Sequence, residues 1–197
     1  MKKFTQYILA AVFSLALLSA APIVARAAGW TSGSCPSSVV IANHTTQENA
    51  SADCWGSSVR AKAGDFVSVR VIYYNASGAP MPNTTTTLNQ PMGTQGSFSF
   101  TGFVTSGGNQ RTGSSVVSFT DGPHSLSLVD VRWYPANPGT PQMMPSTYTQ
   151  NLGTIPTNGV GNVVYKFQVS GNANPNPNPT TGACTINSFT ASPSSVT

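Results

Sequence analysis

The chain of 197 residues is 39% hydrophobic and only 7% charged, with nine basic and five acidic side chains. So few carboxylates argue against a glycosidase or most other hydrolases, which need acidic residues paired across a cleft. Three basic residues lie within residues 1–27, so the remainder has a net charge of +1. The other six are scattered along the sequence, which argues against a nucleic-acid partner, because such proteins cluster their basic residues: Arg60, Lys62, Arg70, Arg111, Arg132 and Lys166.

Residues 1–27 have the pattern of a signal peptide. Lys2 and Lys3 precede an apolar run from Ile8 to Leu18, and Ala25-Arg26-Ala27 has the small-x-small form that signal peptidase cuts. We therefore expect an extracellular or cell-surface protein that begins at Ala28 and has no membrane insertion after the signal is removed. An uncleaved anchor is the alternative, because the apolar character extends over nearly a membrane-spanning length.

Alternating apolar and polar residues predict strands, because successive side chains of a strand point to opposite faces. In chain order the predicted strands are Val39 to Ile41, Phe66 to Tyr74, Thr84 to Leu88, Ser97 to Val104, Ser115 to Phe119, Ser125 to Tyr134, Leu152 to Ile155 and Val163 to Val169. The second and the last have the clearest alternation. Together they should line one core with Val67, Val69, Val71, Tyr73, Tyr165, Phe167 and Val169.

Two of these strands contain a break in phase. Gly102 separates Phe98 and Phe100 from Phe103, which predicts a bulge or bend at the glycine. In Ser125 to Tyr134, Leu126 and Leu128 are out of phase with Val131 and Trp133. A bulge near Leu128 would reconcile them, and so would a strand that crosses between sheets.

Turn residues punctuate the strands at fairly even spacing, as in Asn75-Ala76-Ser77-Gly78 and Asp121-Gly122-Pro123. No helical period is evident outside the signal. Many short strands with such punctuation predict an all-β domain over residues 28–171, an antiparallel β-sandwich with Greek-key connections. A closed barrel is the alternative.

Three cysteines in an exported chain favour disulfide chemistry. Cys35 and Cys54 are predicted to be joined, whereas Cys184 should find its partner beyond Thr197. A zinc site is the competing interpretation. The sequence has no C-x-x-C pair, and neither His44 nor His124 has ligand-like spacing to the thiols.

The C-terminal part predicts a modular protein. Residues 172–183 alternate Asn with Pro175, Pro177 and Pro179, which excludes a helix and an inner strand and predicts a disordered, semi-rigid linker. Residues 184–197 then resemble the first strand of a second domain. We therefore expect downstream modules of the same chain as partners.

A family resemblance is carried by the stretch from Ala63 to Gly78, AGDFVSVRVIYYNASG, and by Tyr165 to Val169. These segments resemble the conserved-repeat domain of bacterial surface proteins, a family of unknown function with an immunoglobulin-like β-sandwich. Residues 184–197 are similar to the opening of another immunoglobulin-like module. The resemblance implies a surface or structural role and supplies no catalytic residue.

The sequence gives little support for catalytic residues. His44 and His124 are expected to be solvated loop residues, and the sequence has neither a G-x-S-x-G elbow nor an H-E-x-x-H motif. Trp55, beside Cys54, is expected to be a core plug, with a sugar-stacking platform as the alternative. We therefore predict no enzyme activity, no cofactor and no metal site.

The segment from Tyr134 to Gln150 contains four prolines, which exclude an inner strand. Its apolar surface comes from Tyr134, Met143, Met144 and Tyr148. The segment is therefore a candidate contact loop for a partner, either another surface protein or a glycan. The alternative is a stiff loop folded against the sandwich. The sequence thus predicts a non-enzymatic structural or presentation module, with an adhesin-type or carbohydrate-binding module as the second hypothesis.

Overall fold

The computed structural model describes residues 30–171, apart from residues 32–34, 36, 52 and 136–138. The predicted signal peptide, the Pro/Asn linker and residues 184–197 with Cys184 lie outside the described residues. Within the described ranges the chain contains strands and no helix. It follows that no helix in this part of the chain could cross a membrane.

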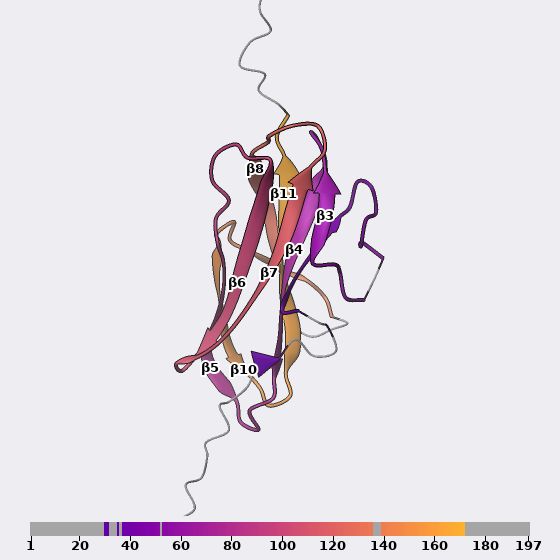
Figure 1. The fold of residues 1–197 in the computed structure, drawn as a ribbon. Coiled ribbons are helices and arrows are strands. Elements are labelled where there is room, and N and C mark those ends of the chain that lie inside the picture. The colour runs from indigo at the N-terminus through magenta and orange to yellow at the C-terminus, as the bar shows by residue number, and fades with distance from the viewer. Residues whose placement is uncertain (1–29, 32–34, 36, 52, 136–138, 172–197) are drawn as a thin grey trace, which may run out of the picture.

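The strands form two sheets that lie face to face (Figure 1). The first, called here the β4 sheet, contains β1 (Trp30–Thr31), β2 (Val39–Asn43), β4 (Phe66–Asn75), β11 (Val160–Val169), β8 (Leu126–Tyr134) and β9 (Gln142–Met144). The second, the β6 sheet, contains β10 (Thr149–Ile155), β5 (Met81–Leu88), β6 (Ser97–Ser106), β7 (Asn109–Phe119) and β3 (Ser58–Ala61). The predicted all-β sandwich is confirmed.

The strand order of the β6 sheet is that of a Greek key. β5, β6 and β7 follow one another as antiparallel neighbours, and β10 returns from the other sheet to pair with β5. β3 pairs with the far side of β7 in parallel, which makes this sheet mixed. In the β4 sheet, β11 lies between β4 and β8, so the two strongest predicted strands are direct neighbours.

The predicted core residues of β4 and β11 are all buried, with at most 1% of their surface exposed. Burying each such side chain contributes about 1.5–3 kcal/mol to stability. Of the alternate residues, Gln168 is exposed, whereas Arg70 and Lys166 are half-buried and Ser68 is buried. The register is therefore correct, although Ser68 on the outer face is also buried.

Of the bulge or bend predicted at Gly102, the bulge is absent from β6, and that alternative is wrong. Pairing with β7 continues without a shift from Ser97 to Ser106. Gly102 faces the core, where an added Cβ would lie 2.7 Å from Cγ2 of Val39 and 3.0 Å from Cγ2 of Val71. The phase appears broken only because Phe103, a large apolar residue, is on the half-buried outer face.

The bulge predicted near Leu128 is present. Lys166 of β11 pairs with Asp130, but the next residue, Phe167, pairs with Leu128, so Val129 is an extra residue in β8. Val129 is 43% exposed. The bulge allows leucines before it and Val131 and Trp133 after it to pack on the same core.

Candidate binding groove on the outer face of the β4 sheet

A disulfide fixes a loop over the outer face of the β4 sheet. Cys35 and Cys54 are joined, with their Cα atoms 5.4 Å apart, as predicted. Trp55, next to Cys54, is only 7% exposed and packs with Val40, Ala42 and Ile72 in a small second cluster. The core-plug interpretation of Trp55 is therefore correct, although the cluster lies outside the sandwich rather than between its sheets.

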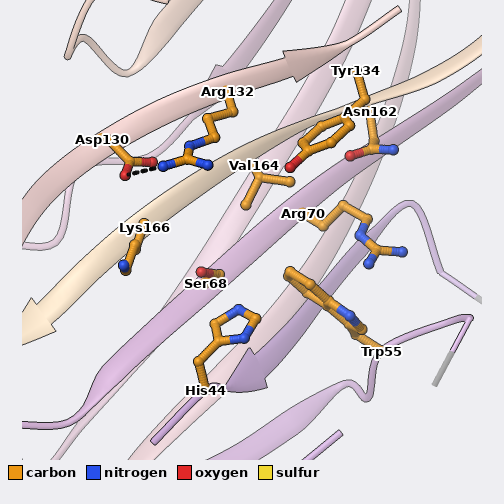
Figure 2. A pocket seen from close by; sticks show the side chains of 10 residues that line it. All are labelled: His44, Trp55, Ser68, Arg70, Asp130, Arg132, Tyr134, Asn162, Val164 and Lys166. Carbon is orange, nitrogen blue, oxygen red and sulfur yellow. Dashed lines mark hydrogen bonds and ion pairs between the residues drawn. The ribbon is translucent and has the colours of Figure 1, made fainter. Parts of the chain in front are cut away.

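Beside this loop lies a groove of about 350 Å³ (Figure 2). Its floor consists of outward-facing residues of β4, β11 and β8, and its wall on the β2 side is formed by Trp55 and His44. The ten lining residues are His44, Trp55, Ser68, Arg70, Asp130, Arg132, Tyr134, Asn162, Val164 and Lys166.

The pairing of three strands places the floor residues in rows. Arg70, Val164 and Arg132 form one row, because Val164 of β11 pairs with Arg70 on one side and with Arg132 on the other. Cross-strand partners point to the same face of a sheet. The next row along the strands, two residues away, contains Ser68, Lys166 and Asp130.

Arg70 lies at the end of the groove that Trp55 closes, and its neighbours hold it there. Its guanidinium carbon lies 3.9 Å from the centre of the Trp55 ring, and its Nη1 donates a hydrogen bond to the carbonyl oxygen of Asp53 at 2.9 Å. Such a cation–π contact contributes about 0.5–2 kcal/mol, depending on desolvation. Burial lowers the pKa of Arg70 below its usual range, and electrostatic interactions with Tyr134 and Asp53 partly offset this shift.

His44 closes the same end. Its ring meets the Trp55 ring edge-on, with centroids 5.3 Å apart. Burial lowers the pKa of His44, and the positive charges of Lys166 and Arg70 lower it further. At neutral pH the imidazole is therefore uncharged, and it offers the groove a neutral polar group.

The opposite end contains the only carboxylate among the lining residues. Asp130 accepts a hydrogen bond from Nη2 of Arg132 at 3.3 Å. Lys166 extends along the strand, with its ammonium 4.7 Å from the centre of the Phe66 ring. With His44 neutral, three cations and one carboxylate give the groove a charge of +2, whereas the other charged residues of the domain sum to −1.

In both arginines one guanidinium donor has no partner within the described residues, and it is closed to solvent. This donor is the Nε atom of Arg70 and of Arg132. A guanidinium has five N–H donors in a fork that matches a carboxylate or phosphate. The excess positive charge of the groove is what suits it to holding an anion.

The predicted contact loop divides between this groove and the core. Tyr134 lines the groove, and Met143 of β9 pairs with Arg132, so it extends the Arg70 row on the same face and is 66% exposed. Met144 and Tyr148 instead pack against the core, and Tyr148 stacks on Phe167 with centroids 6.3 Å apart. β9 is an edge strand, as the exclusion of an inner strand requires.

The two histidines differ from the solvated loop residues expected. His44 is half-buried in the groove, as described above. His124 is only 1% exposed, with its Nε2 2.7 Å from Oδ1 of Asp121 and its ring against Phe119. A hydrogen bond from the backbone N–H of Ala63, aided by His124, lowers the pKa of Asp121. His124 thus anchors the turn before β8.

Sequence reasoning missed the groove because it counted basic residues only along the chain. Arg70, Arg132 and Lys166, half of the basic residues beyond residue 27, converge in space. The available signal was their position on predicted outer faces of strands. Within the described part of the chain, no three His, Cys, Asp or Glu side chains are grouped to hold a metal ion.

Comparison with known proteins adds no assignment: no protein-family model, curated protein or solved structure matches this chain. The groove's own chemistry is therefore the basis for a functional proposal.

Proposed function

We propose that this protein is an exported, non-enzymatic module of a larger bacterial surface protein and that it recognises an anionic ligand in the outer-face groove. The observation that carries the proposal is the convergence of Arg70, Arg132 and Lys166 on adjacent strands. Of the two hypotheses drawn from the sequence, this is the ligand-recognition one.

The convergence leaves the groove with an excess of positive charge. Like charges on neighbouring positions of a sheet repel, and only Asp130 compensates them within the groove. The chain has few charged residues, so their gathering here is not a consequence of a generally charged surface. A bound anion would neutralise the excess charge.

A purely structural or presentation role remains the second candidate. The disulfide and the small cluster around Trp55 make the outer face rigid, which suits a spacer unit. In that case the three cations would be a solvated face with no saturable ligand.

The experiment is a titration of the oxidised full chain with glucuronate, sulfate and neutral glucose, followed by backbone amide chemical shifts. We expect saturable shifts with the two anions, confined to β4, β8, β11 and the disulfide loop, and none with glucose. Arg70→Gln should weaken anion binding about tenfold or more, because it removes charge-assisted hydrogen bonds.

The matched control is Arg60→Gln, which removes the same charge from a side chain that is 77% exposed on the other sheet. It should leave anion binding unchanged. If neither anion gives saturable shifts, or if both substitutions have equal effects, the recognition proposal is wrong and the structural role is favoured.

A further inference from the structure

We infer that the ligand is a linear acidic glycan that lies across the strands, from Arg70 to Met143. This inference rests on the proposed anion recognition and extends it to the class of ligand and its direction. The row Arg70, Val164, Arg132 and Met143 crosses β4, β11, β8 and β9 in register. Three interstrand spacings make this track about 15 Å long.

The track is closed at one end and open at the other. Beyond Arg70, the next residue of the row is Val40 of β2, which is buried in the cluster around Trp55. At the other end, Met143 is 66% exposed on the edge strand β9. A chain molecule can therefore place one end against Trp55 and leave over the edge at β9.

The two guanidinium groups are held by different partners at different ends of the groove. The guanidinium of Arg132 is directed toward Asp130, and that of Arg70 lies beside Trp55, with Val164 and the Tyr134 ring between them (Figure 2). Their Cα atoms are two strand spacings apart, about 10 Å. Two anionic groups on one chain would satisfy both arginines, whereas a monovalent ligand would satisfy one.

A hydroxyl and an apolar side chain lie between the two arginines, which favours a sugar over other polyanions. The half-buried Tyr134 offers a hydroxyl for ligand hydroxyls, and Val164 gives an apolar patch for C–H groups, whereas Ser68 and Asn162 are buried. An acidic peptide would gain most by pairing with a strand edge. The groove instead crosses the face of the sheet, so its floor strands already pair on both sides.

A single-stranded nucleic acid would need open aromatic faces on which bases stack. Trp55 is unsuitable, because it is 7% exposed and Arg70 covers one face of its ring. The same observation excludes Trp55 as a sugar-stacking platform. Sugar recognition at this site therefore depends on charge and hydrogen bonds, with Met143 as the apolar contact at the open end.

The test is calorimetric titration of the oxidised full chain with uronic acid oligosaccharides of increasing length. Sulfated and neutral oligosaccharides of equal length, an acidic hexapeptide and a single-stranded oligonucleotide complete the panel. We expect affinity to rise with glycan length and then level off once the track is filled. Stronger binding of the carboxylated or of the sulfated series identifies the anionic group, and either supports the inference.

Met143→Ser should weaken binding of the long oligosaccharides about fivefold, which corresponds to the loss of roughly 1 kcal/mol of apolar contact. It should leave the affinity for the monosaccharide unchanged. The control is Met92→Ser, at a methionine that is 72% exposed in the segment between β5 and β6. It should change neither affinity.

Three results would overturn the inference. Equal affinity for monomer and oligomer would contradict a linear track, while leaving anion recognition intact. Tighter binding of the peptide or of the oligonucleotide than of any glycan would contradict the ligand class. A lack of binding by every anion would reject both this inference and the proposed function.

Discussion

Arg70 on β4 and Arg132 on β8 are each the cross-strand neighbour of Val164 on β11. Different neighbours hold the two guanidinium groups: Trp55 and the Asp53 carbonyl hold the first, and the Asp130 carboxylate holds the second. They are thus positioned at two ends of one groove and supported independently. A ligand with two anionic groups can bind both without either arginine giving up its support.

The disulfide should contribute both to stability and to binding. Cys35→Ala with Cys54→Ala opens a loop whose ends are 19 residues apart in sequence. The expected loss is about 3 kcal/mol of unfolding free energy, measured by urea denaturation. Anion affinity should also fall, because Trp55 and His44 would no longer be held against the closed end of the groove.

Reduction of the native protein with a phosphine provides the control for this variant. Reduction should lower the stability of the native protein to that of the double variant. The same treatment should leave the stability of the double variant unchanged. Equal stability of the oxidised and reduced proteins would contradict a structural role for the bridge.

Trp55→Ala should destabilise the domain as a core substitution does. The indole is nearly buried between Val40, Ala42 and Ile72. Removing a large aromatic side chain from such a site costs about 3–5 kcal/mol. Thermal denaturation measures the loss, and normal stability combined with lost sugar binding would instead identify Trp55 as an exposed platform.

Gly102→Ala should destabilise β6 by overpacking. Its added methyl would lie 2.7 Å from a methyl of Val39 and 3.0 Å from one of Val71, so the core must shift, at a cost of about 1–3 kcal/mol. Gly96→Ala is the matched control, since nothing lies within 4 Å of its added Cβ. Urea denaturation compares the two, and equal stability would mean that the core has room at Gly102.

The strands themselves were largely predictable, because alternation is a local property. The segments at Phe66–Asn75 and Val160–Val169 alternate over their length and have the predicted core residues. β1, with two residues, β3, with four, and β9, with three, were missed, because so short a pattern cannot be told from chance. The error at Gly102 arose from assuming that every phenylalanine of a strand faces the core.

The groove could not be predicted, because it depends on register between distant strands. Nothing local relates Arg70 to Val164 or to Arg132, and a shift of one residue in either pairing would separate them. The bulge at Val129 was visible in the sequence as a phase change. Its consequence for the positions of Asp130 and Arg132 opposite β11 was not.

His44 should make both stability and binding depend on pH. Its folded-state pKa is below the ordinary value of 6.5, so below pH 6.5 the unfolded chain binds more protons and stability falls as pH decreases. A bound anion favours the imidazolium, so anion affinity should rise over the same range. The charged groups facing or near His44 are Arg70, Lys166, Asp130, Arg132 and Asp53.

The measurement is the His44 ring chemical shift against pH, with and without glucuronate. Ligand should move the midpoint upward, and His44→Gln should remove the rise in affinity at low pH. A midpoint that stays fixed when ligand saturates the groove would contradict contact between the anion and this end of the groove.

The central claim is that an anionic ligand binds through the cations of the groove, and the salt dependence of affinity tests it most directly. For an acidic oligosaccharide, the logarithm of the association constant should fall linearly with the logarithm of salt concentration, because binding releases counterions. Arg70→Gln and Arg132→Gln should each make this slope shallower, whereas Arg60→Gln should leave it unchanged. A slope near zero, or one that the groove substitutions and the Arg60 control alter equally, would contradict the account.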